Sequence, residues 1–173
     1  TGLFAGYLDL RKAFPRVQRV LLWKRLVEQG ISLRGLNALR GLYRSTSACT
    51  RGPDGFSPPF ALDVGLREGC VPSQLLFVVF LSPVVHDLEE TARRIGQEHF
   101  VGLHTPAGWW AVVVTLMFPG DTVLLARTLV GLQALQDTFS AFCFRWNLEL
   151  SVEKSRAVWH RPVDSRFEVR VGA

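Results

Sequence analysis

The chain has 173 residues and a formal net charge of +5, and 48% of its residues are hydrophobic while 20% are charged. This size and composition indicate one globular domain with a buried core and exclude a disordered chain. The longest apolar runs, at residues 75–81 and 109–118, are about half of the roughly 20 residues that a membrane-spanning helix needs, so no membrane association is expected. The positive charge suits a nucleic-acid partner, although a domain with an ordinary charged surface has the same composition.

The start of the chain and its cysteines bear on where the protein works. The chain begins with Thr1 and carries no secretory signal, which favours a fragment of a longer protein. Its three cysteines, Cys49, Cys70 and Cys143, are odd in number and have no zinc-type spacing. Reduced thiols and an intracellular location, the nucleus included, are therefore expected. The sequence does not indicate an oligomeric state.

The first quarter of the chain is predicted to be one strand followed by two helices. Residues 3–10 (LFAGYLDL) are short, apolar and aromatic, which is typical of a buried strand that ends near Asp9. Apolar residues at helical spacing follow up to Gly30, a plausible stop signal. Ser32 is placed to cap a second helix that continues to about Tyr43.

The middle of the chain predicts a loop, a short strand and a long helix. Residues 50–60 are rich in glycine and proline and predict a loop, which leads into a short strand at 60–64. From Ser73, apolar residues recur every four positions up to Ala92, as on one face of a helix. Pro83 lies inside this pattern and is expected to kink or divide the helix.

The second half predicts a further loop at 102–108, a hairpin, a helix and several strands. The expected strands lie at residues 111–118, 122–126, 148–152, 157–160 and 167–171, and the helix lies at 129–146. This order is close to βαββαβ, the split βαβ plan. We therefore predict an α+β fold of the split βαβ type, an antiparallel sheet with helices packed on one face. In that plan Asp9 and Asp121 come close in space.

Two carboxylates on adjacent strands are typical of a divalent-metal site. Magnesium is held by one or two carboxylates, with water and substrate phosphates completing its ligands, and two such ions can clamp a phosphoryl transfer. The alternative is that Asp9 caps the turn before the first helix while Asp121 only serves the hairpin turn. The residue pattern by itself leaves both interpretations open.

Four sequence motifs carry a family resemblance. The segments YLDLRKAFPRV, GLREGCVPSQLLF, MFPGDTVLLA and LQALQDTFSAFCFRWNLELSVEKS occur in this order between Tyr7 and Val158. They resemble the palm motifs of reverse transcriptases, RNA-directed DNA polymerases, of the non-LTR retrotransposon type. In that family the third motif normally reads Tyr-Ala-Asp-Asp. Four motifs in register are a far more specific signal than any one of them.

The resemblance implies a role for individual residues of this chain. It implies Mg²⁺ as cofactor and RNA and DNA, as template and primer, as partners. Asp9 takes the place of the first metal-binding and catalytic aspartate, and Asp121 that of the second aspartate of the turn motif. The nucleotide- and template-binding positions are Phe14, Arg67, Gly69 and Lys154. The simpler alternatives are a core phenylalanine, a glycine-rich turn before a helix and a surface lysine.

The largest departure from the family pattern falls on the catalytic turn. Gly120 occupies the place of the main metal-binding aspartate and offers no carboxylate, and Pro119 stands beside it. Pro-Gly favours a type II turn, whereas two-residue hairpins prefer the primed types. Side chains alternate between faces along a strand, which argues against a one-residue slip of Asp121 into the lost position. We therefore expect impaired polymerase activity and no productive Mg²⁺ binding.

The chain is expected to be a single palm domain over residues 1–173, a fragment in which most of the fingers and the thumb are absent. A non-catalytic nucleic-acid-binding module is the main alternative, because a split βαβ sheet can present aromatic side chains to bases. A protein-interaction or structural remnant of a retroelement is a third interpretation.

Overall fold

A four-stranded antiparallel sheet forms the centre of the fold. The computed structural model describes residues 2–104, 110–118 and 120–160. The sheet order is β10-β1-β9-β8, built from β1 (Leu3–Asp9), β8 (Thr115–Phe118), β9 (Asp121–Ala126) and β10 (Arg156–His160). The first strand thus lies between the last strand and the central hairpin, as in the split βαβ plan. The predicted α+β palm-type architecture is confirmed.

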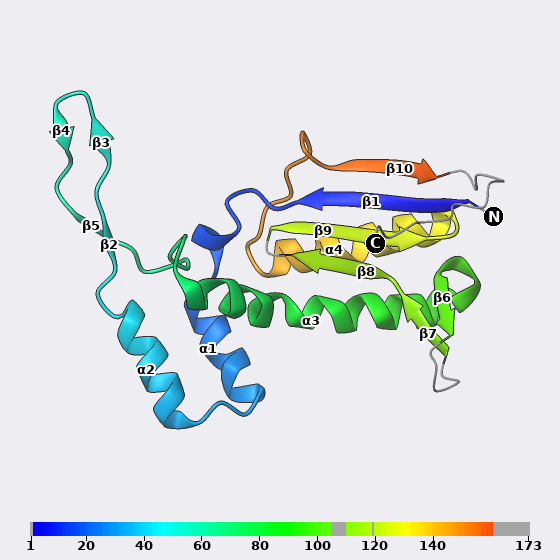
Figure 1. Cartoon of the computed structure of the whole chain (residues 1–173), viewed down its shortest axis with the longest axis horizontal. Helices are drawn as coiled ribbons and strands as arrows, with labels where there is room; N and C mark the ends of the chain where they lie inside the picture. Colours follow the sequence, from blue (N-terminus) through cyan, green and yellow to red (C-terminus); the bar gives the residue numbers. More distant parts are fainter. Residues whose placement is uncertain (1, 105–109, 119, 161–173) are drawn as a thin grey trace, which may run out of the picture.

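Helices cover one face of this sheet and leave the other open. Two helices, α3 (Val71–Ile95) and α4 (Leu129–Arg145), pack against each other, and α4 contacts both β1 and β9 (Figure 1). Along β9 the residues alternate, with Thr122, Leu124 and Ala126 buried and Asp121 exposed. This period of two places the core on the helix side and turns Asp121 to the open side.

The long helix α3 runs without interruption through Pro83. Proline has no N–H, so the carbonyl of Val79 loses its usual helical donor. The Ser82 hydroxyl donates to that carbonyl at 2.9 Å and replaces the missing bond. The proline therefore does not divide the helix, which was one of the two outcomes that the sequence pattern allowed.

By length and composition, α3 is also the one helix among the described residues that could cross a membrane. The expectation that no apolar segment is long enough was therefore wrong on length. Core helices of soluble proteins pass the same test. The side chains of Phe77, Phe80, Val84 and Leu88 are fully buried, and α3 packs against α4 and against α1 (Arg19–Glu28). Packing in the core thus accounts for its apolar composition.

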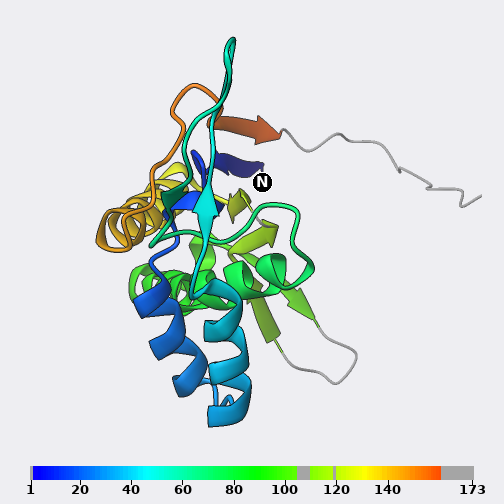
Figure 2. The same cartoon turned by 90° about the vertical axis from the view of Figure 1, so that its left-hand side faces the viewer.

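A narrow β-ribbon extends from the helical side of the fold (Figure 2). It follows α2 (Leu33–Tyr43), whose first turn is capped by Ser32 as predicted. Its two strand pairs are β2 (Ser47–Ala48) with β5 (Phe60–Ala61), and β3 (Arg51–Gly52) with β4 (Gly55–Phe56). The prediction of a loop over 50–60 missed this ribbon, because each strand has only two residues and glycine and proline surround them.

Other differences from the predicted elements occur around the hairpin. β6 (Val101–His104) and β7 (Trp110–Val113) form a separate two-stranded sheet, so the expected single strand over 111–118 is broken between β7 and β8. The predicted strand at 148–152 is reduced to one bridge between Leu10 and Leu150. The predicted strand at 167–171 lies outside the described residues.

Arg19 fastens the base of the ribbon to the first helix. Its side chain is buried and donates to the backbone carbonyls of Gly65 and Leu62 at 2.8 Å, and of Tyr43 and Val64 at 3.2 Å. Burial lowers the pKa of this guanidinium from its ordinary value, because desolvation disfavours the charged form. The four carbonyls are the compensation that such a buried charge requires.

The buried thiol of Cys143 gives a prediction that tests the packing of α4. Burial raises the pKa of Cys143 to about 12, whereas Cys49 is exposed. At pH 8 roughly one molecule in ten thousand then carries a Cys143 thiolate, the reactive form. We expect iodoacetamide to alkylate Cys49 at least about a hundredfold faster than Cys143 in the native chain. Peptide mass spectrometry measures both rates.

The same labelling in urea is the control, since unfolding exposes both thiols to solvent. Because the folded pKa is raised, Cys143 should stay slow to react up to about pH 10 and speed up only as the pH approaches 12. Equal rates for Cys49 and Cys143 in the native chain would contradict the packing.

Candidate active site

Asp9 and Asp121 lie directly opposite each other at the end of two neighbouring strands. The antiparallel register of β1 and β9 pairs Asp9 with Asp121. Residues that are paired in this way point to the same face, with their Cβ atoms about 4.5–5.5 Å apart. That face is the open one, where the Asp9 side chain is 26% exposed and Asp121 is exposed. The sequence prediction that the two come close in space is confirmed.

The register of β1 and β9 shows whether Asp121 can face Asp9 although position 120 has no carboxylate. The alternation of side chains suggested that Asp121 could serve Asp9 only after a one-residue slip. In the structure Asp121 faces the same side of the sheet as Asp9 without any slip. The site therefore keeps a carboxylate pair although Gly120 contributes none.

Hydrogen bonds from two other segments hold the end of β1 in place. The N–H of Asp9 donates to Ser155 Oγ at 3.3 Å, and its carbonyl accepts from the N–H of Ser151 at 2.8 Å. The N–H of Leu10 donates to the carbonyl of Gly120 at 3.0 Å. The turn after β8 and the segment before β10 are thus both tied to the strand that carries Asp9.

Lys154 lies beside the carboxylate pair. Its Nζ is 3.8 Å from Oδ2 of Asp9, and its side chain is 72% exposed. An exposed ion pair at this distance stabilises the fold little, so the lysine is free to move toward an incoming anion. Lys154 is close to Asp9 in space although 145 residues separate them in the sequence.

The glycine of the turn is open to solvent on its side-chain side. Gly120 has a φ of 98°, in the region that favours glycine, and a Cβ built on it would meet no atom within 4 Å. This φ suits the second central residue of a type II turn. Pro119 lies outside the described residues. The side-chain side of position 120 is therefore open space and not a filled pocket.

Phe14 and Gly69 meet in a second part of the site. They line a cavity of about 380 Å³ together with Glu68, Cys70, Val71, Ser73 and Gln74. The Phe14 ring stacks on Phe77 at a centroid distance of 4.9 Å, which fixes its orientation. The segments of the first two motifs thus meet at this cavity. Arg67 is placed differently, because its guanidinium lies 5.9 Å from the centre of the Tyr43 ring.

Sequence reasoning missed an ionic cluster next to Asp9. Arg11 and Arg16 both form ion pairs with Glu149, and the N–H of Arg11 donates to the Glu149 carbonyl at 2.7 Å. These contacts join the segment after β1 to the segment after α4. Two arginines within seven residues of Asp9 were visible in the sequence, but their partner was not. Asn147, after α4, has a φ of 57°, in the left-handed region that asparagine tolerates better than most residues.

The donor set limits which metal site can form. Within the part of the chain that the structure describes, no group of three or more His, Cys, Asp or Glu side chains is placed to hold a metal ion. Asp9 and Asp121 alone supply two carboxylates on one face. That set fits one Mg²⁺ that is held jointly with substrate phosphates and water. It does not fit an ion that the protein encloses by itself.

Comparison with known proteins decides the family. Residues 5–165 match the protein-family model for reverse transcriptase (RNA-dependent DNA polymerase). The chain belongs to the reverse transcriptase family. Members of this family generally use Mg²⁺ and act on nucleic-acid templates. The family prediction from the four motifs is therefore confirmed.

Solved telomerase structures share the fold of this reverse transcriptase domain. Apo telomerase from Candida tropicalis, truncated from its C-terminal domain, aligns with a TM-score of 0.66 and 13% identity over 95% of this chain and 32% of its own. Telomerase from Candida albicans, solved with a fragment of telomeric RNA, aligns with a TM-score of 0.66 and 12% identity over 91% of this chain and 28% of its own. The chain spans about a third or less of these telomerase chains, and at such identities the likeness concerns the fold alone.

Proposed function

We propose that residues 1–173 are a reverse transcriptase palm domain of the non-LTR retrotransposon type with a reduced catalytic site. Asp9 and Asp121 hold one Mg²⁺ together with the phosphates of a nucleotide, and nucleotidyl transfer is impaired. The observation that carries this proposal is the register that pairs Asp9 with Asp121 on the open face of the sheet. RNA and DNA, as template and primer, are the proposed partners, and an intracellular location follows from them.

The remaining residues act on the nucleotide by position. Lys154 lies beside Asp9 and can exchange its ion pair with the Asp9 carboxylate for one with the departing pyrophosphate. Phe14 and Gly69 line the cavity that takes the sugar and base, with Phe14 packing under the sugar. Bound Mg²⁺ supplies charge that neutralises the phosphate oxygens during transfer. Arg67 does not line this cavity, because its guanidinium lies over the Tyr43 ring.

The missing carboxylate accounts for the impairment. Phosphoryl transfer in this family relies on metal ions that stabilise both the attacking and the leaving oxygens. Gly120 has no side chain to complete such a set. A loss of about 4–5 kcal/mol of transition-state stabilisation lowers the rate roughly a thousandfold or more. The site then still binds a complex of metal and nucleotide, but it catalyses nucleotidyl transfer slowly.

Primer extension and metal binding together test this function. We expect extension of an RNA-templated DNA primer roughly a thousandfold slower than by an intact family member. Titration with Mn²⁺, followed by electron paramagnetic resonance, should show one site in the presence of a nucleotide. Asp9→Ala should abolish both signals. Asp54→Ala, which removes an exposed carboxylate from the ribbon tip, is the matched control and should leave both unchanged. Binding of Mn²⁺ that survives Asp9→Ala would refute the proposed site.

A non-catalytic nucleic-acid-binding module is the second candidate, and one observation favours it. In the absence of metal, the Lys154 ammonium lies 3.8 Å from the Asp9 carboxylate. Its positive charge partly replaces that of a metal ion and so lowers the affinity of the site for one. This candidate predicts nucleic-acid binding that weakens steeply with salt and is indifferent to Mg²⁺. Wild-type chain that binds a primer–template without any Mn²⁺ site would establish it over the catalytic proposal.

A further inference from the structure

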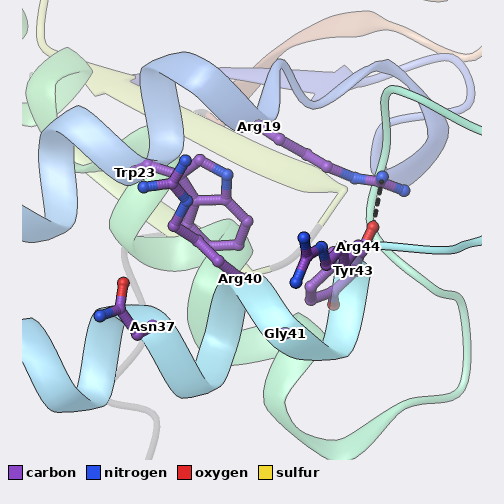
Figure 3. A pocket seen from close by; sticks show the side chains of 7 residues that line it. All are labelled: Arg19, Trp23, Asn37, Arg40, Gly41, Tyr43 and Arg44. Carbon is purple, nitrogen blue, oxygen red and sulfur yellow. Dashed lines mark hydrogen bonds between the residues drawn. The ribbon is translucent and has the colours of Figure 1, made fainter.

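A pocket of about 490 Å³ lies between α1 and α2, apart from the carboxylate pair. Both helices extend below α3, on the side away from β1 and β10 (Figures 1 and 2). The pocket is lined by Arg19, Trp23, Asn37, Arg40, Gly41, Tyr43 and Arg44 (Figure 3). Its volume lies within the range of small-ligand sites. None of these residues has a part in the proposed transfer reaction.

Two guanidinium groups at the pocket are available to a ligand. Arg40 lies in the last turn of α2 and Arg44 is its C-cap residue, four positions further on, and both are exposed. Neither guanidinium forms an ion pair or hydrogen bond with another side chain or carbonyl in the described part of the chain. The helix itself, from Leu33 to Tyr43, contains no acidic residue. This end of the pocket is therefore an uncompensated positive surface, suited to phosphate groups.

The opposite wall supplies flat apolar surface. Trp23 is half-buried and its ring lies 5.9 Å from that of Tyr43, which fixes the indole against the core. Arg40 extends from α2 toward Trp23 (Figure 3). A base can stack on such a ring or on a guanidinium plane, and the exposed amide of Asn37 can both donate to and accept from a base edge.

Arg19 and Gly41 also line the pocket, but neither is expected to contact the ligand. The Arg19 guanidinium is occupied by four backbone carbonyls, so it lines the pocket as a fixed positive charge. Gly41 lies in the last turn of α2, where glycine weakens a helix. Gly41 lines the pocket and a Cβ at this position would meet no atom within 4 Å, so there is room for a larger side chain on this wall.

We propose that the pocket between α1 and α2 binds a segment of single-stranded nucleic acid, one base on Trp23 and the flanking phosphates on Arg40 and Arg44. An acidic peptide would use the two arginines but would have no need of a fixed indole and an amide beside them. The site holds nucleic acid away from the carboxylate pair and does not depend on whether that pair is catalytic.

Binding of a fluorescein-labelled RNA octamer, followed by anisotropy at several salt concentrations, tests the site. Replacing Arg40 and Arg44 with serine should weaken binding roughly tenfold and reduce the slope of log affinity against log salt by about 1.4. The control exchanges Arg34 and Lys24, exposed residues of the same two helices that do not line the pocket, for serine. It removes the same charge and should change the affinity less than about twofold.

A second pair of variants separates pocket binding from charge and from folding. Gly41→Leu fills the pocket, keeps every charge and improves helix propensity, so it should weaken RNA binding roughly tenfold. Gly41→Ala strengthens the helix without filling the pocket and should leave the affinity unchanged. An octamer with abasic sites should bind the wild-type chain roughly tenfold more weakly than the normal octamer.

Three results would overturn the proposal. One is equal loss of affinity in the control that lacks Arg34 and Lys24. Another is full binding by Gly41→Leu. The third is an octaglutamate peptide that binds as tightly as the RNA and shows the same dependence on the pocket. Manganese binding at Asp9 and primer extension are separate readouts, so the failure of either proposal can be told from that of the other.

Discussion

Replacing Arg19 with methionine is expected to lower the free energy of unfolding by about 3 kcal/mol, a large fraction of the stability of a domain of this size. Methionine keeps the apolar stem but removes the donors that serve the carbonyls of Tyr43, Leu62, Val64 and Gly65. A buried carbonyl that loses its donor costs about 1–3 kcal/mol, and the two bonds at 2.8 Å contribute most of the effect. Urea unfolding followed by circular dichroism measures the change.

Lys24→Met is the matched control, because Lys24 is an exposed basic residue of the same helix. It should change the free energy of unfolding by less than about 0.5 kcal/mol. Arg19→Lys should fall between the two, since an ammonium has three donors and lacks the planar fork. A loss for Arg19→Met no larger than that for Lys24→Met would show that the ribbon base does not depend on this contact.

The sheet could be predicted from the order of elements, because its strands have recognisable local sequence patterns. Residues 3–10 are apolar and aromatic, and the return strand of the hairpin follows a Pro-Gly corner. When strands and helices alternate along the chain in this order, short connections allow few antiparallel strand orders. The observed order, β10-β1-β9-β8, is one of them. The neighbourhood of Asp9 and Asp121 follows from this order alone. Their register does not, because it depends on the geometry of the turn.

Contacts between distant segments could not be predicted from the sequence. Arg19 resembles any exposed basic residue at the start of a helix, since its four carbonyl partners come from residues 43 and 62–65. The pairing of Arg11 and Arg16 with Glu149 is hidden for the same reason. Pro83 was expected to kink or divide a helix that the hydroxyl of Ser82 keeps continuous. In each case a polar partner far away, or one residue away, sets the outcome.

Restoring a carboxylate at the turn is expected to raise the rate of primer extension roughly a thousandfold. The variant carries Gly120→Asp together with Pro119→Ala. The new side chain would project into open space at the end of the sheet that carries Asp9 and Asp121, because a Cβ at position 120 meets no atom within 4 Å. A φ of 98° strains any residue with a Cβ, although aspartate tolerates the left-handed region better than most. Removing the proline frees the turn to adopt the primed geometry that two-residue hairpins prefer.

Pro119→Ala with Gly120→Asn is the matched control, because asparagine has the shape of aspartate and the same tolerance of positive φ but no charge. A gain in extension and a further Mn²⁺ site in the aspartate variant alone would show that the missing carboxylate limits the wild-type chain. Equal gains in both variants would assign the defect to the conformation of the turn. A new Mn²⁺ site without extension would show that the remaining defect lies in nucleotide binding. Phe14, Gly69 and Lys154 would then be the next residues to change.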